Sequence, residues 1–286
     1  YKEKFKEFNL AKSKFETVLK SNPEERLILP SKYNLYKIYE LLGQTGEAKI
    51  AKNDIISNYP ESRYAIILSN PELAYLKDEN SPESVYEDIY QQHENQQYAE
   101  VISKCENYIN VFDGEPIVPK LELLKATATG RLFGYEPYSK AINYVAVTFA
   151  NTPEGQQAQE IETNLLPRIQ SKEFVLDSPA NNYKVVFKFD KTGTSEIKTF
   201  QDTLVKVLKN IKYYDLSASL DVYNPDITFV IVHGLKNKVV AKTFDQLLSK
   251  EDKKKIKKSY FVISSFNYQI IQIHKNLDSY LSIDNN

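Results

Sequence analysis

Three prolines in the first half of the chain lie at a constant distance from an alanine. The alanine comes 12 residues before the proline in each of three pairs: Ala11 and Pro23, Ala48 and Pro60, Ala141 and Pro153. A small residue lets two antiparallel helices cross closely, and a proline cannot continue the helix that precedes it. The residues four and seven positions after the alanine share its face. Four of these six are apolar, namely Phe15, Val18, Ile55 and Val145. The shared spacing predicts stacked helix pairs.

This pattern is typical of the second helix of a tetratricopeptide repeat. In the best-formed unit, the first helix has packing residues at Leu35, Tyr36 and Tyr39, and a GQTGE turn leads to the second helix. Residues 84–109 fit a further, divergent unit, with the equivalent positions at Tyr86, Tyr90 and Ala99. We therefore expect four helix pairs, the first incomplete, in a short helical solenoid.

A solenoid of this kind holds a peptide or a partner helix on its concave face and acts as a scaffold. In the best-formed unit, the groove positions fall at Tyr33, Lys37 and Glu40. These three residues are our candidate protein-binding site. The alternative is that they are ordinary solvated side chains of a surface helix.

Charge and composition divide the chain near residue 180. Residues 181–286 carry 17 Lys, no Arg and 11 acidic groups, whereas the preceding part is acidic overall. Residues 171–182, SKEFVLDSPANN, mix turn-forming residues without periodicity. We predict a tetratricopeptide-repeat domain at 1–170, a linker at 171–182 and an α/β domain at 183–286.

The C-terminal part alternates strand and helix patterns. Strands are predicted at 183–189, 214–223, 227–234 and 260–265, helices at 195–211 and 238–250, and a final helical stretch at about 266–282. This β-α-β-β-α-β order is the split βαβ pattern of the ferredoxin-like fold. The predicted fold class is therefore α+β and multidomain. We expect both helices on one sheet face and the other face free to bind a partner.

The stretch DKTGT, which begins at Asp190, matches the phosphorylated aspartate of P-type ion pumps. However, the chain has no apolar run of 18 residues that could span a membrane, and Thr192 stands where related hydrolases have a second Asp. A strand ending at Asp190, followed by a turn and a helix capped by Thr194 or Ser195, explains the stretch without chemistry. We interpret it as a turn, with an Asp190 nucleophile as the alternative.

Other catalytic or metal-binding patterns are weak. His93, His233 and His274 lack metal-ligand spacing, and we expect the single cysteine, Cys105, to be a small buried apolar residue. The basic stretch at 250–260 has neither Arg nor interleaved aromatic residues, so we interpret it as a solvated approach to a strand. We expect no enzymatic activity, cofactor, metal or nucleic-acid partner.

Two stretches carry a family resemblance. Residues 56–72, ISNYPESRYAIILSNPE, extend a repeat into a Ser-Arg-Tyr-Ala and Asn-Pro tail, and residues 261–282 run from the last strand into a Lys-Asn-x-Asp-x-Tyr-Leu ending. With repeats first and an α/β unit last, the chain resembles the PorW/SprE family of the Bacteroidetes type IX secretion and gliding machinery.

The resemblance implies a noncatalytic periplasmic adaptor, anchored to the outer membrane, that couples an inner-membrane motor to the outer-membrane translocon. Its partners would be motor or ring subunits, and its membrane contact would be an N-terminal lipid anchor. Because the chain starts at Tyr1 and has no Met, we expect a fragment whose lipid-bearing cysteine lies upstream. The alternative is a peptidoglycan-binding envelope protein, since SPOR modules share the β-α-β-β-α-β order.

Overall fold

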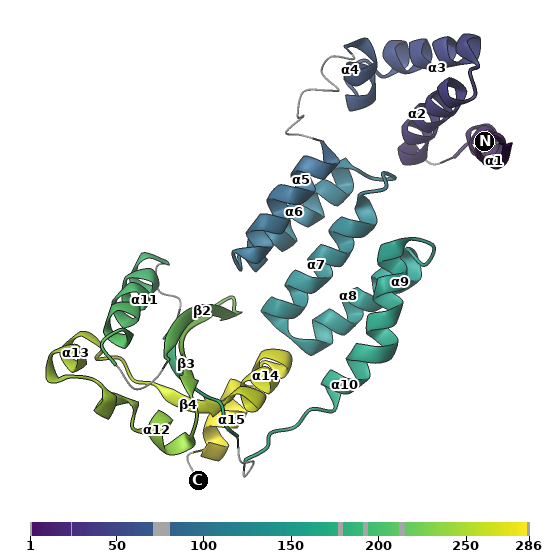
Figure 1. The fold of residues 1–286 in the computed structure, drawn as a ribbon. Coiled ribbons are helices and arrows are strands. Elements are labelled where there is room, and N and C mark those ends of the chain that lie inside the picture. Colours follow the sequence, from purple (N-terminus) through teal and green to yellow (C-terminus); the bar gives the residue numbers. More distant parts are fainter. Residues whose placement is uncertain are drawn as a thin grey trace. The chain divides into compact units, whose positions relative to one another are not determined.

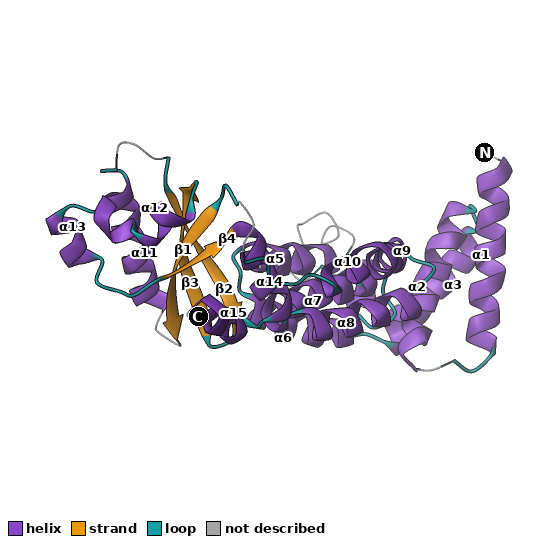
Figure 2. Ribbon diagram, turned by 90° about the horizontal axis from the view of Figure 1, so that it is seen from below, coloured by secondary structure: helices purple, strands orange, loops and turns teal. Residues whose placement is uncertain are grey.

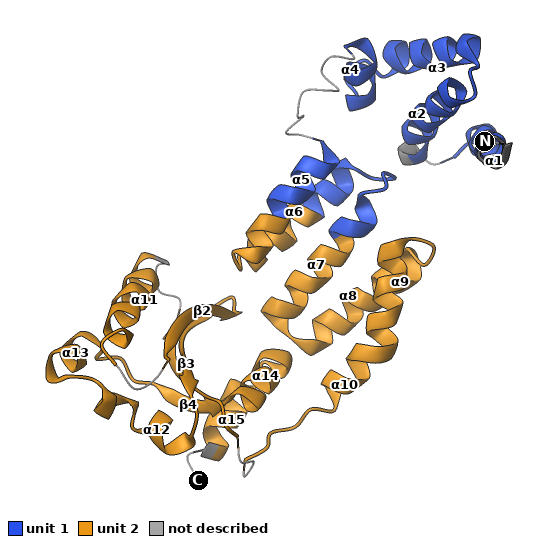
Figure 3. Cartoon of the chain, viewed as in Figure 1, with its two compact units in different colours: residues 1–89, 106–121 blue, residues 90–105, 122–286 orange. Residues whose placement is uncertain are grey.

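The structure is a computed structural model that describes residues 2–23, 25–70, 81–176, 180–190, 194–211 and 215–284 (Figure 1). It is mostly helical, with a small four-stranded antiparallel sheet in the C-terminal part. The chain divides into two compact units (Figure 3). Unit 1 comprises Tyr1–Ile89 and Glu106–Leu121, and unit 2 comprises Tyr90–Cys105 and Glu122–Asn286.

Unit 1 begins with four helices: α1 (Lys2–Lys20), α2 (Glu25–Leu41), α3 (Thr45–Asn58) and α4 (Arg63–Ser69). Of these, α2 and α3 are joined by a short turn and pack against each other. The chain turns between α2 and α3 at Gly43, whose φ of +70° favours glycine. Tyr36, Ala48 and Ile55 are buried together with Ala65 of α4. The packing positions predicted at Tyr36 and Ala48 are therefore confirmed as core positions.

Three helices pass from one unit to the other: α5 (Pro82–Glu94), α6 (Tyr98–Val111) and α7 (Val118–Phe133). Two of the three predicted packing positions of the divergent repeat are wrong, because Tyr90 and Ala99 are exposed, whereas Tyr86 is partly buried. The buried residues are instead Val85 and Ile89 on α5, and Val101 and Cys105 on α6. The two residues of each pair are one helical turn apart, so each helix does have a buried face. This face is rotated about the helix axis relative to the face that the sequence predicted.

The helical part of unit 2 continues with α8 (Tyr135–Thr148), α9 (Pro153–Glu160), the π-helical turn η2 (Ile161–Leu165) and α10 (Leu166–Gln170). Ile142 and Val145 are fully buried here, whereas Ala141 is only partly buried. Pro153 is the first residue of α9, where its missing N–H costs nothing. The side chain of Thr152 caps this helix by accepting a hydrogen bond from the Gly155 N–H at 3.1 Å.

The sheet of unit 2 has the strand order β2-β3-β1-β4, and its three strand pairs are antiparallel. Its strands are β1 (Tyr183–Asp190), β2 (Ser217–Asn224), β3 (Ile227–Leu235) and β4 (Phe261–Ser264). All four predicted strands are therefore present. Helix α11 (Thr194–Leu208) also matches its prediction. The single helix predicted at 238–250 is wrong, because α12 (Lys238–Lys242), the 3-10 turn η3 (Phe244–Leu247) and α13 (Lys250–Lys255) divide that region.

Both faces of the sheet are covered, which overturns the expectation of a free face. One face packs Phe187 and Val230 against Leu204 of α11 and Phe244 of η3. The other face packs Val186, Phe229 and Ile231 against two helices, α14 (Ser265–His274) and α15 (Leu277–Asp284). Figure 2 shows α11 to α13 and α14 to α15 on opposite sides of the strands.

The second face is covered because the final helical stretch is broken. Lys275 ends α14 in the left-handed conformation, with φ +53°, so the chain turns before α15 begins. The turn brings Leu277 and Tyr280 of α15 under the sheet, next to Ile271 of α14. One continuous helix over 266–282 would run straight on. Its second half could then not turn back under the sheet, and part of this sheet face would stay uncovered.

Part of the segment predicted as a linker packs against these C-terminal helices. The ring of Phe174 lies 5.4 Å from that of Tyr280. The Val175 N–H donates to Asn267 Oδ1 at 3.0 Å, and Asn267 Nδ2 donates to the Val175 carbonyl at 3.0 Å. The domain boundary at 171–182 stays a prediction, while residues 174 and 175 are fixed to α14 and α15.

Candidate functional site

Helix α2 carries the three residues predicted to line a protein-binding groove. Lys37 and Glu40 are exposed and form an ion pair with 3.6 Å between Nζ and Oε2. Glu40 also accepts a hydrogen bond from the Tyr36 hydroxyl at 2.5 Å. Tyr33 is half-buried, and its ring centroid lies 4.5 Å from that of Tyr64 on α4. The structure brings Lys37 and Glu40 together at the surface, and their role in a groove stays a prediction.

Unit 1 has a hollow of about 260 Å³ that the sequence did not reveal. It is lined by residues of α1, α2 and α3: Leu19, Lys32, Leu35, Tyr39, Glu47, Ile50, Ala51 and Asp54. An ion pair of 2.6 Å between Lys32 and Asp54 joins two of its walls. Ile50 of α3 borders this hollow and is 72% exposed.

Asp190 lies at the end of β1 with an exposed side chain. Its carboxylate forms an ion pair of 3.0 Å with Lys188. The KTG residues at 191–193 lie outside the described residues, and α11 begins at Thr194. An exposed carboxylate paired with a lysine of its own strand has the surroundings of an ordinary surface residue.

A serine and a histidine meet on the sheet face that α14 and α15 cover. Ser219 Oγ lies 2.7 Å from His233 Nε2, and Lys184 Nζ lies 3.1 Å from His233 Nδ1. The Lys184 ammonium can only donate, so Nδ1 accepts and the proton of the neutral ring is on Nε2. Nε2 therefore donates to Ser219, and in this state it cannot take the serine proton as a general base. Burial and the charge of Lys184 lower the pKa of His233, which keeps the ring neutral.

A polar cluster around Asp221 lies on the same sheet face. Together with Ser219, His233 and Lys184 it forms a polar stripe across that face. The Tyr268 hydroxyl donates to Asp221 Oδ2 at 2.5 Å, and Gln272 Nε2 donates to the same oxygen at 3.0 Å. Burial raises the pKa of Asp221, and these hydrogen bonds oppose that rise. The arrangement ties β2 to α14 through one largely desolvated carboxylate.

Lys275 joins this cluster to the helical part of unit 2. Its Nζ donates to the backbone carbonyl of Arg131 at 2.8 Å and to Gln272 Oε1 at 2.9 Å. Arg131 lies in the last turn of α7, where the free carbonyls and the helix dipole favour a cation. The ammonium also lies 4.9 Å from the centre of the Tyr223 ring on β2. One side chain thus contacts α7, α14 and β2.

Gln96 makes a second connection between the helices and the sheet of unit 2. Its Nε2 donates to the Leu220 carbonyl at 3.0 Å, and its Oε1 accepts from the Val222 N–H at 2.9 Å. These are backbone groups on β2, an edge strand of the sheet. The turn between α5 and α6 presents Gln96 with a φ of +60°. The carboxamide therefore occupies part of an edge that could otherwise pair with another strand.

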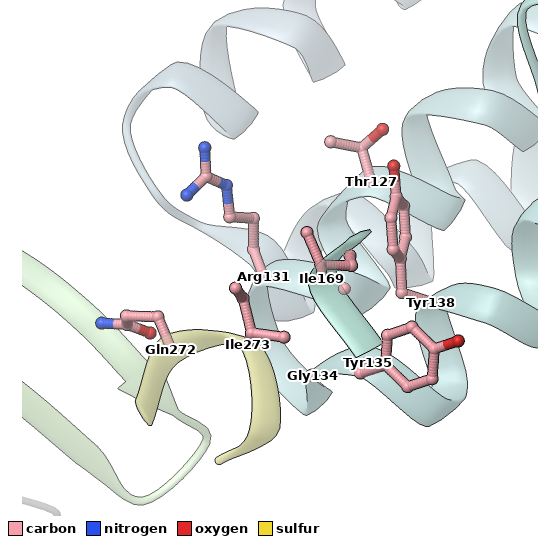
Figure 4. A pocket seen from close by; sticks show the side chains of 9 residues that line it. Thr127, Arg131, Gly134, Tyr135, Tyr138, Ile169, Gln272 and Ile273 are labelled. Atoms are coloured by element: carbon pink, nitrogen blue, oxygen red, sulfur yellow. The ribbon is translucent and has the colours of Figure 1, made fainter. Parts of the chain in front are cut away.

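A cavity of about 250 Å³ lies beside this junction, inside unit 2 (Figure 4). Its walls come from α7, α8, α10 and α14 and comprise Thr127, Gly130, Arg131, Gly134, Tyr135, Tyr138, Ile169, Gln272 and Ile273. We call this space the α7–α14 cavity. It combines an arginine and two tyrosines with two isoleucines, a mixture that suits a small amphipathic ligand.

The basic stretch at 250–260 forms α13 and an extended segment that leads to β4. Lys255, Lys257 and Lys258 border an open hollow of about 580 Å³, together with Phe189 and Phe200. Lys258 Nζ lies 4.3 Å from the centre of the Phe189 ring. The segment is therefore not wholly solvated, since Ile256 between these lysines is buried.

Other candidate groups have ordinary surroundings. Cys105 is buried and unbonded to another cysteine, which confirms its predicted burial. In the described part of the chain, no three His, Cys, Asp or Glu side chains cluster closely enough to hold a metal ion. Among the same residues, no helix is both long and apolar enough to cross a membrane.

Sequence reasoning missed the polar stripe on the sheet, although β2 alternates in a way that could have indicated it. Ser219, Asp221 and Tyr223 lie two residues apart, and so share one face of the strand.

The chain matches no model of a known protein family and no curated protein. The function therefore has to be argued from the structure and from the resemblance described above.

Proposed function

We propose that the protein is a noncatalytic adaptor that holds other proteins together. The observation that supports this most is the succession of helices from α2 to α8, in which α2 and α3 pack together as one pair and α7 and α8 as another. Arrays of such helix pairs expose long helix surfaces that bind peptides or partner helices. The exposed Lys37 and Glu40 on α2 present one such surface in unit 1. We assign the helix pairs to tetratricopeptide repeats.

The C-terminal sheet supports a ferredoxin-like assignment. A split βαβ pattern places the first strand between the third and the fourth, and the strand order β2-β3-β1-β4 has this arrangement. The extra helices α14 and α15 go beyond the basic pattern and cover the second face. In our proposal this module is a rigid, closed platform that docks through its outer surface.

We further propose that the partners belong to the type IX secretion and gliding machinery. The proposal is supported by the resemblance of residues 56–72 and 261–282 to the PorW/SprE family. The described part of the first stretch forms the end of α3 and the whole of α4, and the second forms β4, α14 and α15. On this proposal the protein acts in the periplasm, anchored to the outer membrane, between motor and ring subunits.

Peptidoglycan binding is the alternative that the fold favours less. A module that binds glycan on an open sheet face needs that face to be accessible. Here Ile271, Leu277 and Tyr280 fill it with buried apolar side chains. Glycan could reach that face only if α14 and α15 left it, which would expose a hydrophobic core to water.

Affinity purification from cell envelopes tests the proposal. The tagged protein should retain motor or translocon subunits of the secretion machinery after gentle detergent extraction. A charge-exchanged variant, Lys37→Glu with Glu40→Lys, should lose partners that bind α2, because the positions of the two charges are swapped while an ion pair can still form. Thermal melting should confirm that it folds without the hydrogen bond from Tyr36 to Glu40. Retention on isolated cell-wall sacculi without any retained protein would instead favour peptidoglycan binding.

A further inference from the structure

The α7–α14 cavity owes its shape to one face of α7. Gly130 and Arg131 come three and four residues after Thr127, so these three residues line the same side of the helix, and Gly134 directly follows its last residue. A Cβ on Gly130 would lie 2.7 Å from the Tyr138 ring, and one on Gly134 would lie 2.7 Å from the Ile273 carbonyl oxygen. The two glycines therefore let α8 and α14 approach α7 closely and form walls on either side.

The guanidinium of Arg131 is the charged group of this cavity wall. The Arg131 guanidinium is exposed, and no hydrogen bond or ion pair to it is present among the described residues. Lys275, the neighbouring cation, already donates to the Arg131 carbonyl and to Gln272. Asp221, a carboxylate within the field of Arg131, already accepts from Tyr268 and Gln272.

Two cations lie close enough to repel each other here, Arg131 and Lys275. Both also interact with the carboxylate of Asp221. Burial lowers the pKa of Lys275 to about 8, Asp221 opposes the fall, and Arg131 adds to it. An anion beside Arg131 would offset this repulsion.

The remaining walls are suited to an apolar group. Ile169 and Ile273 face the cavity with the ring of Tyr135. The Tyr138 hydroxyl has no hydrogen-bond partner among the described residues, and Figure 4 shows it beside Thr127, with Ile169 between it and the guanidinium. The charge of Arg131 nevertheless acts on Tyr138. Thr127 donates its own proton to the Leu123 carbonyl, so Tyr138 is the hydroxyl that can donate to a ligand.

We propose that the α7–α14 cavity binds a small carboxylate with an apolar or aromatic body. The carboxylate pairs with the Arg131 guanidinium and accepts a hydrogen bond from Tyr138, while the body packs against Ile169 and Ile273. A space of about 250 Å³ is smaller than the roughly 300–1,000 Å³ of pockets for drug-sized molecules, so the ligand has about the size of one ring or one side chain.

Such a carboxylate could be a free small molecule or the last residue of a peptide chain. Calorimetric titration of the full chain with two matched pairs of probes separates these sources. One pair is 3-phenylpropionate and 3-phenylpropionamide; the other is acetyl-Ala-Ala-Phe with a free or an amidated C-terminus. We expect both acids to bind and both amides to fail. Tighter binding of the peptide acid identifies a peptide terminus, and equal or weaker binding identifies a small molecule.

Variants locate the site. Arg131→Gln should weaken binding of 3-phenylpropionate roughly tenfold or more, because the charge-assisted hydrogen bonds are lost. Tyr138→Phe should weaken it less, and Arg168→Gln, on the exposed side of α10, should leave it unchanged. Circular dichroism and thermal melting should confirm that each variant folds.

Three results would overturn the proposal. These are no binding of either acid at roughly 10 mM, equal binding of an acid and its amide, and undiminished binding by Arg131→Gln. None of these results bears on the adaptor function, since that function depends on the helix surfaces and not on this cavity.

Discussion

Gln96 and Val222 lie 126 residues apart in the sequence, yet the side chain of the first accepts a hydrogen bond from the backbone of the second at 2.9 Å. The same carboxamide donates to the Leu220 carbonyl. A residue in the turn between two helices thus bonds two backbone groups of an edge strand. The turn between α5 and α6 and the sheet belong to the same compact unit, and this contact joins them.

Removal of the Gln96 side chain should therefore destabilise unit 2. Gln96→Ala leaves the Leu220 carbonyl and the Val222 N–H without their partner, which should lower the free energy of unfolding by about 1–3 kcal/mol. Hydrogen exchange at the Val222 amide should also become faster. Gln97→Ala, at the exposed neighbouring position, is the control and should change neither quantity. Unchanged exchange at Val222 in Gln96→Ala would contradict this account of the edge.

Lys275 should make stability depend on pH. Its pKa is about 8 in the folded protein, against an ordinary value of 10.5. Between these two values the unfolded chain holds more protons than the folded one, so stability rises as pH increases. Relative to Lys275→Gln, the wild-type free energy of unfolding should rise by roughly 2 kcal/mol between about pH 7 and pH 9.5.

Urea denaturation of both proteins over this pH range gives the measurement. The tyrosines with raised pKa values are present in both proteins, so their ionisation cancels in the difference to first order. Parallel stability curves would show that Lys275 titrates at its ordinary pKa and is not desolvated at the end of α7.

The hydroxyl of Tyr268 should contribute measurably to stability. Tyr268→Phe removes the donor at 2.5 Å from Asp221 and leaves a half-buried carboxylate with one hydrogen bond fewer. We expect a loss of about 1–3 kcal/mol in the free energy of unfolding. The matched control is Tyr144→Phe, because Tyr144 is 50% exposed and its hydroxyl has no hydrogen bond among the described residues. Equal stability of the two variants would exclude a strong Tyr268–Asp221 interaction.

Two glycines should respond differently to the addition of a methyl group. Gly134 has a φ of +88°, and a Cβ there would lie 2.7 Å from a backbone oxygen. Gly134→Ala should therefore destabilise the protein by more than about 1 kcal/mol. Gly46, in the first turn of α3, has no atom within 4 Å of an added Cβ. Gly46→Ala should be neutral or stabilising, and thermal melting of both variants distinguishes these outcomes.

The sequence was most informative where local patterns decide the structure. β1 was predicted because Val185, Val186 and Phe187 form a buried apolar run, and such a run favours a strand whatever surrounds it. The helix α11 was equally clear, since its apolar residues repeat with the period of a helix. The prolines at 23, 60 and 153 correctly marked ends or starts of helices.

The sequence was least informative where distant residues decide. Nothing near Lys275 predicts a left-handed residue, because glycine or asparagine usually occupies that position, and the break there is what covers the second sheet face. The buried face of α6 was misplaced because the alanine pattern was followed in place of Val101 and Cys105. The α7–α14 cavity combines residues from four helices, so no single stretch could reveal it.

Site-specific photocrosslinking in cell envelopes tests the central claim, that this protein is an adaptor, most directly. A photoreactive amino acid replaces Lys37 on the exposed face of α2 or, as the control, Lys140 on the exposed side of α8. We expect the Lys37 position to crosslink to a discrete subunit of the secretion motor or ring, and the Lys140 position to give no such product. Equal, diffuse or absent crosslinking at both positions would contradict a protein-binding surface on α2.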